Sequence, residues 1–227
     1  MTIMEIFANY YQYFLRGTRT TILISLITVF CGFLLGCVIA LLRLSKNRIL
    51  NGFAKLYITV LRGTPLLVQL YIVYYQLDFI PYPKVNIWGV ALERALPCVI
   101  ALSLNSASYV AEVIRSGIQA VDIGQSEAAR SIGMTNGQTM LHIVMPQAIK
   151  NILPAIGNEM IALLKETAVA GYVAVQDLTR AGNLIRNNTY DSFNPLMLVA
   201  VVYLVLVIGM TQLLGLLERR LRRSDKR

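Results

Sequence analysis

Residues 20–42 read TTILISLITVFCGFLLGCVIALL, an apolar run with no charged residue that is bounded by Arg19 and Arg43. A helix rises 1.5 Å per residue, so this run would be about 34 Å long as a helix. The hydrocarbon core of a bilayer is about 30 Å thick, and about 20 apolar residues span it. The run therefore predicts a transmembrane helix over about residues 18–42.

The whole chain combines two properties that soluble domains rarely combine. Its 227 residues are 56% apolar, and its 21 Lys and Arg against 12 Asp and Glu give a net charge of +9. The mean hydropathy is +0.59 and the isoelectric point is near 9.6. A basic chain can bind nucleic acid, but here the positive residues stand at the ends of apolar runs and form no single patch. The composition indicates a membrane protein in contact with lipid and argues against a soluble enzyme or a nucleic-acid-binding protein.

Four further segments predict spans. The second follows Arg62-Gly63-Thr64-Pro65, because proline suits the first turn of a helix. The third lies between Arg94 and Arg115, and the last precedes the basic tail. The fourth is mostly apolar but contains charged residues, so we expect it to be shielded from lipid. The expected bounds are about residues 64–80, 95–114, 149–172 and 194–217. The fold class is therefore an all-α integral membrane protein, a single domain over residues 1–227 with five transmembrane helices.

The distribution of positive residues predicts the orientation. Lys and Arg near the ends of spans are retained on the cytoplasmic side. With the amino terminus outside, fourteen of the 21 positive residues flank the inner ends of the spans, six flank the outer ends, and Lys165 lies within the fourth span. We therefore expect the amino terminus outside and the carboxyl terminus in the cytoplasm.

Small residues inside the spans predict close packing. Gly32 and Gly36 have the GxxxG spacing, which lets a second helix approach closely. The three cysteines, Cys31, Cys37 and Cys98, lie in apolar stretches without a CxxC spacing or a nearby pair of histidines. We expect them to be packing residues, and we expect no metal site and no catalytic residue in this chain.

The polar segment of residues 115–148, between the third and fourth spans, predicts two short helices. Ser126 can cap a helix that starts at Glu127, and Gly133 can end that helix after about two turns. A second helix would run from Gln138 until Pro146 bends or ends it.

This segment carries a recognisable spacing. Three residues separate Glu127-Ala128-Ala129 from Gly133, nine residues separate Gly133 from Ile143, and Pro146 is three positions after Ile143. The pattern resembles the EAA motif of ABC importer permeases, and it departs from that motif in having Met145 where Leu is usual.

Two other stretches resemble the polar amino-acid branch of that family. One is Arg62-Gly63-Thr64-Pro65, and the other is Lys165-Glu166-Thr167, where the family more often has Asp or Asn at the position of Glu166. The resemblance covers most of the chain and implies a type I ABC importer permease fold. It also implies that ATP drives the uptake of polar amino acids across the cell (plasma or inner) membrane of a prokaryote.

The resemblance implies partners that composition alone does not. These are a second permease chain, identical or related, two ABC ATPase subunits that bind ATP and Mg, and an extracytoplasmic amino-acid-binding protein. We expect this chain to bind no cofactor, and we do not expect it to be an enzyme. The loop would be a coupling helix seated in a groove of the ATPase, so that ATPase closure moves the spans. The residues expected to make this contact are Glu127, Ala128, Ala129, Arg130, Gly133 and Met134. By itself, Glu127 could equally only stabilise the start of its own helix.

Polar residues inside the spans suggest where an amino acid binds. In the fourth span, Glu159, Leu163 and Glu166 share one helix face and Lys165 lies on the adjoining stripe. Ionisable groups within a span are costly and indicate a functional site, and a cavity with both charges suits a zwitterion. From the third span, Asn105, Ser106 and Tyr109 can add hydrogen bonds. Alternatively, Lys165 and Glu166 only pair with other helices or lie at the headgroups, and Asn105 and Tyr109 are structural. Selectivity for cationic amino acids such as arginine stays open.

Two other functions compete with this interpretation. An ion-coupled secondary transporter would explain charges near the membrane centre, but the sequence shows no internal repeat and the EAA spacing would be unexplained. A membrane-embedded enzyme would need a motif such as HExxH or GxSxG, and neither occurs in the sequence. The sequence also lacks the GxxxxGK[ST] phosphate loop, so ATP hydrolysis is assigned to another subunit.

Overall fold

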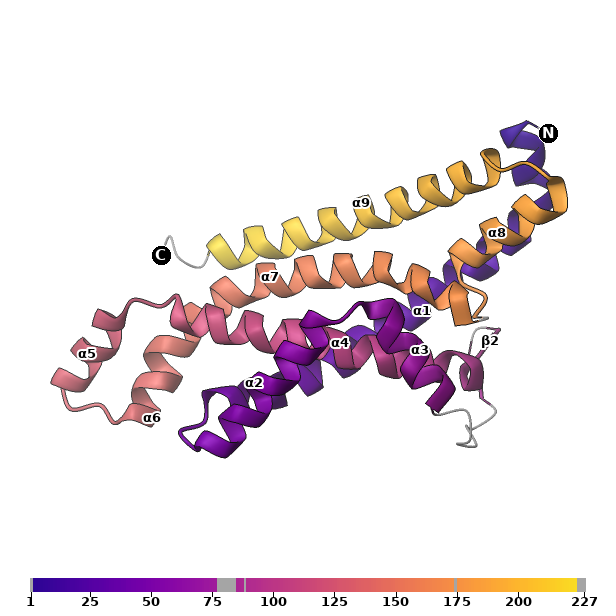
Figure 1. The fold of residues 1–227 in the computed structure, drawn as a ribbon. Coiled ribbons are helices and arrows are strands. Elements are labelled where there is room, and N and C mark those ends of the chain that lie inside the picture. Colours follow the sequence, from indigo (N-terminus) through magenta and orange to yellow (C-terminus); the bar gives the residue numbers. More distant parts are fainter. Residues whose placement is uncertain (1, 77–84, 88, 174, 224–227) are drawn as a thin grey trace.

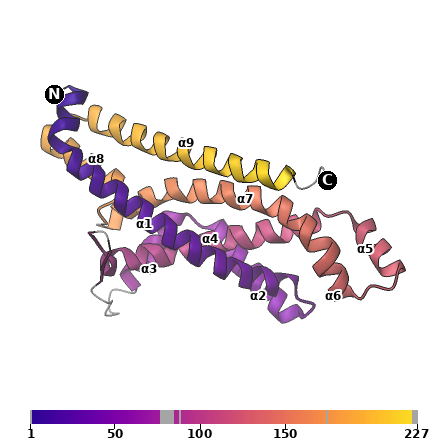
Figure 2. The same ribbon diagram turned by 180° about the vertical axis from the view of Figure 1, so that it is seen from behind.

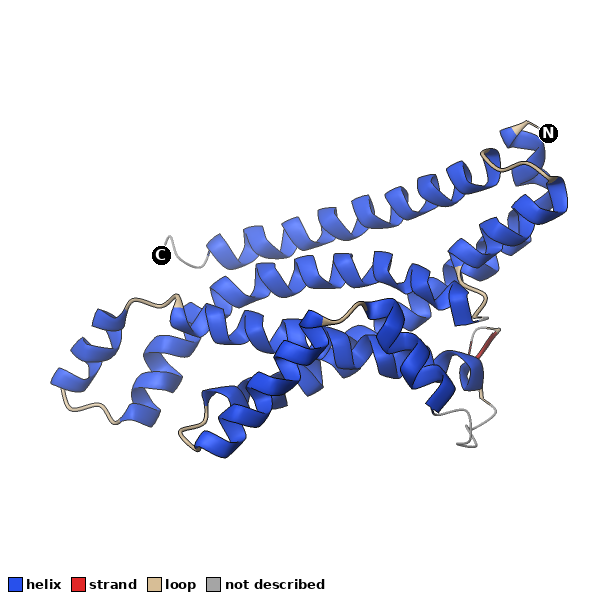
Figure 3. Cartoon of the chain, viewed as in Figure 1, coloured by secondary structure: helices blue, strands red, loops and turns tan. Residues whose placement is uncertain are grey.

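The computed structural model describes residues 2–76, 85–87, 89–173 and 175–223, and these residues are mostly helical (Figure 3). The chain was expected to be all-α, but the described part also contains a small antiparallel hairpin of two strands, β1 (Asn86–Ile87) and β2 (Val90–Ala91). The nine α-helices described are α1 (Ile3–Leu44), α2 (Arg48–Gly63), α3 (Leu66–Gln76), α4 (Leu92–Gln119), α5 (Ile123–Ser131), α6 (Asn136–Thr139), α7 (Met145–Glu166), α8 (Leu178–Thr189) and α9 (Asn194–Arg223). A π-helical turn (Met140–Val144) joins α6 to α7, and a 3₁₀ segment (Thr167–Val173) follows α7.

The long helices are packed side by side around α4. Helix α1 packs most extensively against α4, and α7 lies between α4 and α9. Helices α5 and α6 project beyond the bundle at one end, and α9 ends toward the same end (Figure 1). The amino terminus and α8 lie at the opposite end, as the view from behind also shows (Figure 2).

The first helix is longer than the apolar run that predicts it. It begins at Ile3, where the Thr2 hydroxyl accepts a hydrogen bond from the Glu5 backbone N–H and the Glu5 carboxylate accepts one from the Thr2 backbone N–H. This reciprocal cap starts the helix well before residue 18. The added turns bury Ile6 and Phe14 against Leu178 and Ile185 of α8.

The close approach predicted from Gly32 and Gly36 is confirmed, and the neighbouring helix is α4. A Cβ atom added at Gly36 would lie 2.6 Å from Val110, and one added at Gly32 would lie 3.0 Å from Ser106. The missing side chains therefore let α1 and α4 come together.

Three helices in the described part of the chain are long and apolar enough to cross a membrane, namely α1, α4 over Ala95–Gln119 and α9 over Asn194–Arg219. Helices α2 and α3 pass the same test only together, as a pair bent by 106°. Helix α7, expected as the fourth span, is not among these helices and carries Glu159, Lys165 and Glu166. It nevertheless packs against both α4 and α9.

The helix predicted to begin after Pro65 is confirmed, since α3 begins at Leu66. The preceding helix α2 was not predicted, and the chain turns sharply at Thr64 and Pro65 between the two helices. The physical reason is that proline lacks a backbone N–H and forces an extended conformation on the residue before it, and Thr64 has φ −118° and ψ 146°. Residues 77–80, the expected end of this span, lie outside the described residues.

A buried acidic residue joins α8 to α1. The Asp177 carboxylate accepts hydrogen bonds from the backbone N–H groups of Thr179 and Arg180, each at 3.0 Å, and so caps the start of α8. The next residue, Leu178, donates its backbone N–H to the Thr21 hydroxyl of α1 at 3.2 Å. Gly17 of α1 allows this contact, because a Cβ atom there would lie 2.8 Å from the Asp177 carbonyl oxygen.

Candidate functional site

The predicted coupling loop is a hairpin of two short helices. Helix α5 begins at Ile123, because the Asp122 carboxylate accepts a hydrogen bond from the Gly124 backbone N–H at 2.7 Å. The expectation that Ser126 caps a helix starting at Glu127 is therefore wrong by about one turn. Gly133 does end the helix as predicted, and its φ of +90° is a conformation that residues with a side chain rarely adopt.

The second helix of the loop does not end at Pro146. The Thr135 side chain and Gln138 form a reciprocal cap at the start of α6, and the helix continues through the π-helical turn Met140–Val144 into α7. Pro146 lies in the first turn of α7, directly after the π-helical segment. Proline is tolerated in the first turn of a helix, because its missing backbone N–H would have no partner within the helix there. The hairpin is thus continuous with a helix of the bundle.

The residues expected to contact an ATPase lie on or directly after α5. Ala129 is buried within the hairpin, whereas Glu127, Ala128, Arg130 and Gly133 are exposed. Several large apolar side chains around them are exposed as well, and Ile123, Ile132 and Leu141 are 73%, 82% and 65% exposed. A shallow groove in the hairpin is lined by Ile132, Gly133, Met134, Gln138 and His142. The hairpin therefore presents an apolar surface rimmed by charge, which is typical of a protein contact.

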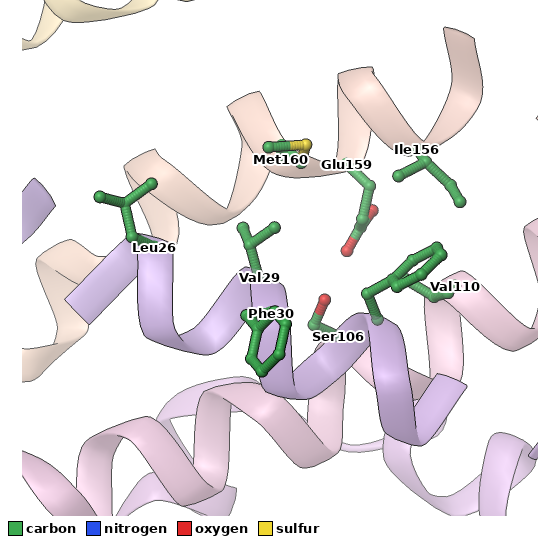
Figure 4. A pocket seen from close by; sticks show the side chains of 9 residues that line it. Leu26, Val29, Phe30, Ser106, Val110, Ile156, Glu159 and Met160 are labelled. Carbon is green, nitrogen blue, oxygen red and sulfur yellow. The ribbon is translucent and has the colours of Figure 1, made fainter. Parts of the chain in front are cut away.

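A pocket of about 240 Å³ lies between α1, α4 and α7. In Figure 4 the Glu159 carboxylate of α7 and the Ser106 hydroxyl of α4 point into the same space, and apolar side chains of α1 form the opposite wall. Glu159 is the charged residue among the lining residues. The lining residues are Leu26, Val29, Phe30, Phe33, Ser106, Val110, Ile156, Glu159 and Met160.

The other residues predicted to bind substrate are not among the residues that line this pocket. Leu163 is buried, Glu166 is half-buried and Lys165 is exposed. Asn105 is buried with its side-chain amide donating to Gln69 and to the Leu61 carbonyl oxygen. Their contact with substrate stays a prediction.

Arg62, which was not predicted as a site residue, lies beside Tyr109, a half-buried residue of α4. The guanidinium carbon of Arg62 lies 4.9 Å from the centre of the Tyr109 ring. In the sequence Arg62 belongs to the Arg62-Gly63-Thr64-Pro65 stretch and was not among the residues predicted to bind substrate, whereas in the structure it stands at the bend between α2 and α3. The signal that points to it is the Gly-Thr-Pro sequence directly after it, which breaks the helix there.

A charged pair lies at the end of α4 that leads into the loop. Arg115 forms an ion pair with Glu112 and also contacts Gln119.

A family model describes most of this chain. Residues 11–223 match the model of the binding-protein-dependent transport system inner membrane component. The arginine transport system permease protein ArtQ of Bacillus subtilis (strain 168) is 38% identical over 213 residues, which is 94% of each protein. The nopaline transport system permease protein NocM of Agrobacterium fabrum (strain C58) is 36% identical over 207 residues, covering 90% of this chain and 86% of NocM.

A solved structure is similar over nearly the whole length. It is described as the crystal structure of an amino acid ABC transporter with histidines, and its matching chain is 42% identical. The two chains superpose with a TM-score of 0.86, covering 97% of this chain and 99% of the other. The fold is therefore that of a type I ABC importer permease.

Proposed function

This chain belongs to the family of binding-protein-dependent transport system inner membrane components, and we propose that it is the membrane subunit of an ATP-driven importer of polar amino acids. The observation that carries the proposal is the hairpin of α5 and α6, which presents the EAA residues at the end of the bundle. The names of the similar permeases support an amino-acid substrate, since one is a permease for arginine and another for nopaline.

The hairpin supports coupling to a separate ATPase. Its exposed Ile123, Ile132 and Leu141 would be covered by a partner, and its continuity with α7 would pass a movement of the partner to the pocket. The partners would be two ATPase subunits that bind ATP and Mg, a second permease chain, identical or related, and an external amino-acid-binding protein. This chain itself would bind no cofactor and hydrolyse no ATP.

The topology we propose has five spans. These are α1, the bent pair of α2 and α3, α4, α7 and α9, with the amino terminus outside and the carboxyl terminus in the cytoplasm of a prokaryotic cell. Helix α9 ends toward the end of the bundle that carries the hairpin, which supports this arrangement. The polar residues of α7 would then face the transport path and not the lipid.

The substrate would bind in and beside the pocket between α1, α4 and α7. An amino acid carries a carboxylate and an ammonium group; Glu159 in the pocket would bind a positive group, and Arg62, which lies over Tyr109 of α4, would bind a negative one. Ser106 adds a neutral hydroxyl. The carboxylate of Glu159 also suits a cationic side chain, so arginine is one of the substrates to be tested.

The test is ATP hydrolysis by the reconstituted transporter. Liposomes would contain this chain with its ATPase and binding protein, and hydrolysis would be measured with each amino acid in turn. We expect hydrolysis to rise with some polar amino acids and not with others. If it never rises, and a proton or sodium gradient drives uptake by this chain alone, the chain is an ion-coupled secondary transporter instead.

A further inference from the structure

The bend between α2 and α3 leaves backbone carbonyl groups without helical partners. Helix α2 ends at Gly63 and α3 begins at Leu66, with an angle of 106° between them. The last carbonyl groups of a helix cannot be satisfied within the helix itself, and a membrane interior supplies little water to replace those partners. A bend at this place therefore needs side chains that bind the freed carbonyl groups.

Gln69 of α3 supplies one such side chain. Its Nε2 atom lies 2.7 Å from the Leu61 carbonyl oxygen, 3.0 Å from the Thr64 carbonyl oxygen and 2.8 Å from the Thr64 hydroxyl. The side chain is buried, with 9% of the residue exposed. Gln69 thus ties the first turns of α3 back to the end of α2.

Asn105 of α4 completes the arrangement. Its Nδ2 atom donates to the Gln69 Oε1 atom at 2.9 Å and to the Leu61 carbonyl oxygen at 3.2 Å. Leu61 therefore accepts hydrogen bonds from both amides, and the bend is tied to a third helix. We call Gln69 and Asn105 the amide clamp.

The amide clamp lies next to the cation at the bend. Arg62 directly follows Leu61, and Tyr109 lies one turn after Asn105 on α4. Since the clamp fixes Leu61 against Asn105, it also sets the distance between Arg62 and the Tyr109 ring, which is 4.9 Å from the guanidinium carbon to the ring centre. Ser106, which lines the pocket, lies three residues before Tyr109 on α4, so Arg62 stands about one helical turn from a pocket residue.

We propose that Gln69 and Asn105 are positioning residues that fix the bend between α2 and α3 and thereby hold Arg62 beside the pocket, where it binds the carboxylate of an amino acid. The role assigned to Arg62 rests on the proposed function, whereas the fixing of the bend does not. The two parts are therefore tested separately.

The first experiment measures the bend without transport. Spin labels would be attached to cysteines placed at the exposed positions Lys55 in α2 and Ile72 in α3, with Cys31, Cys37 and Cys98 replaced by alanine. We expect Gln69→Met, which keeps the length of the side chain but removes its donor, to broaden the distribution of distances between the labels. The matched control is Gln76→Met, at the exposed end of the same helix, which should leave the distribution unchanged.

An unchanged distribution in Gln69→Met would overturn the clamp. If that variant does not assemble in the membrane, Asn105→Leu removes the other half of the clamp and carries the same expectation. A distribution that stays narrow in the variant that assembles then rejects the proposal.

The second experiment measures uptake by the complete transporter. We expect Gln69→Met to raise KM for the transported amino acid about three- to tenfold, with a smaller change in kcat, because the contact with the carboxylate is misplaced. In a chain that already carries Arg62→Gln, the same change should raise KM no further, since residues that act through one another are not additive. Additive effects would show that Gln69 does not act through Arg62. Absence of any amino-acid uptake by the unaltered transporter would instead reject the proposed function and leave the spin-label result valid.

Discussion

The guanidinium group of Arg62 lies over the ring of Tyr109, with 4.9 Å between the guanidinium carbon and the ring centre. Arg62 stands at the bend of α2 and α3, and Tyr109 comes from α4, which packs against α1, α2, α3 and α7. A cation over an aromatic face gains roughly 0.5–1 kcal/mol when exposed and about 2 kcal/mol or more when desolvated. The ring thus offers a favourable place for a charge that would be costly against lipid.

The contact between Arg62 and Tyr109 predicts a difference between two substitutions of the tyrosine. Tyr109→Phe keeps the aromatic face and should leave KM for the transported amino acid within about twofold. Tyr109→Leu removes the face and should raise KM about three- to thirtyfold, which corresponds to roughly 0.7–2 kcal/mol. Equal effects of Phe and Leu would mean that the ring does not hold the cation.

Glu159 should determine the affinity for substrate. Glu159→Gln keeps the size of the side chain and removes its charge, and a hydrogen bond to a charged group contributes about 1.5–3 kcal/mol. We therefore expect KM to rise at least about tenfold, most strongly for cationic amino acids. Asn158→Ala, at the exposed neighbouring position of α7, is the control. Unchanged uptake of every amino acid by Glu159→Gln would make this carboxylate structural.

Gly133 should be required for coupling and not for insertion. Its φ is +90°, and no atom lies within 4 Å of a Cβ added there, so a substitution strains the backbone without a steric clash. A left-handed backbone costs roughly 1–2 kcal/mol for residues other than glycine. Gly133→Val should reach the membrane in normal amounts and lose amino-acid-stimulated ATP hydrolysis at least about fivefold. Gly137→Val, equally open but without a positive φ, should retain it, and normal uptake by Gly133→Val would contradict the prediction.

Gly36 should be required for the packing of α1 on α4. A Cβ at this position would lie 2.6 Å from the Val110 Cβ and 3.1 Å from the Ala107 carbonyl oxygen. Gly36→Val should lower the free energy of unfolding in detergent by about 1–3 kcal/mol, because the two helices must separate. Gly209→Val in α9, where no atom lies within 4 Å of the added Cβ, should change it little. Equal melting temperatures of the two variants would show that this contact is not tight.

The attachment of α8 should depend on pH through Asp177. Burial raises the pKa of this carboxyl from 3.8 to about 6, although hydrogen bonds from the backbone N–H groups of Arg180 and Thr179 partly offset the effect. Between these values the folded state binds more protons than the unfolded state, so the free energy of unfolding falls as the pH rises through this range. The total change is about 3 kcal/mol, which corresponds to the shift of about two pKa units.

Thermal unfolding in detergent between about pH 4 and pH 7 checks the sign of this dependence. Asp177→Asn should flatten the profile in this range, because the amide does not titrate. The control is Asp191→Asn near the start of α9. Hydrogen bonds from Asn194 and from the Phe193 backbone N–H lower the pKa of the Asp191 carboxyl. The stability that Asp191 contributes is therefore lost as the pH falls, which is the opposite sign to the dependence expected for Asp177. A profile that rises from pH 4 to pH 7 in the unaltered chain would contradict the prediction.

Features that depend on neighbouring residues were predictable from the sequence. The apolar run of residues 20–42 predicted a helix that crosses a membrane, and the GxxxG spacing predicted the close approach at Gly32 and Gly36. Gly133 was expected to end a helix and does so with a positive φ. Two helix starts were predicted too late in the chain, because Thr2 and Asp122 cap helices in places where no apolar period marks the boundary.

The composition and the motifs, by themselves, determined that the chain is a membrane protein, and the spacing from Glu127 to Pro146 pointed to its family. These properties follow from residues close in the chain, since hydropathy and motif spacing are local. The tertiary structure alone decided that α4 is the helix against Gly32 and Gly36, that Glu159 and Ser106 share a pocket, and that Gln69 and Asn105 meet at the Leu61 carbonyl group. The physical reason is that these contacts join residues far apart in the chain, and which of them form depends on how the bent and straight helices fill the space between one another.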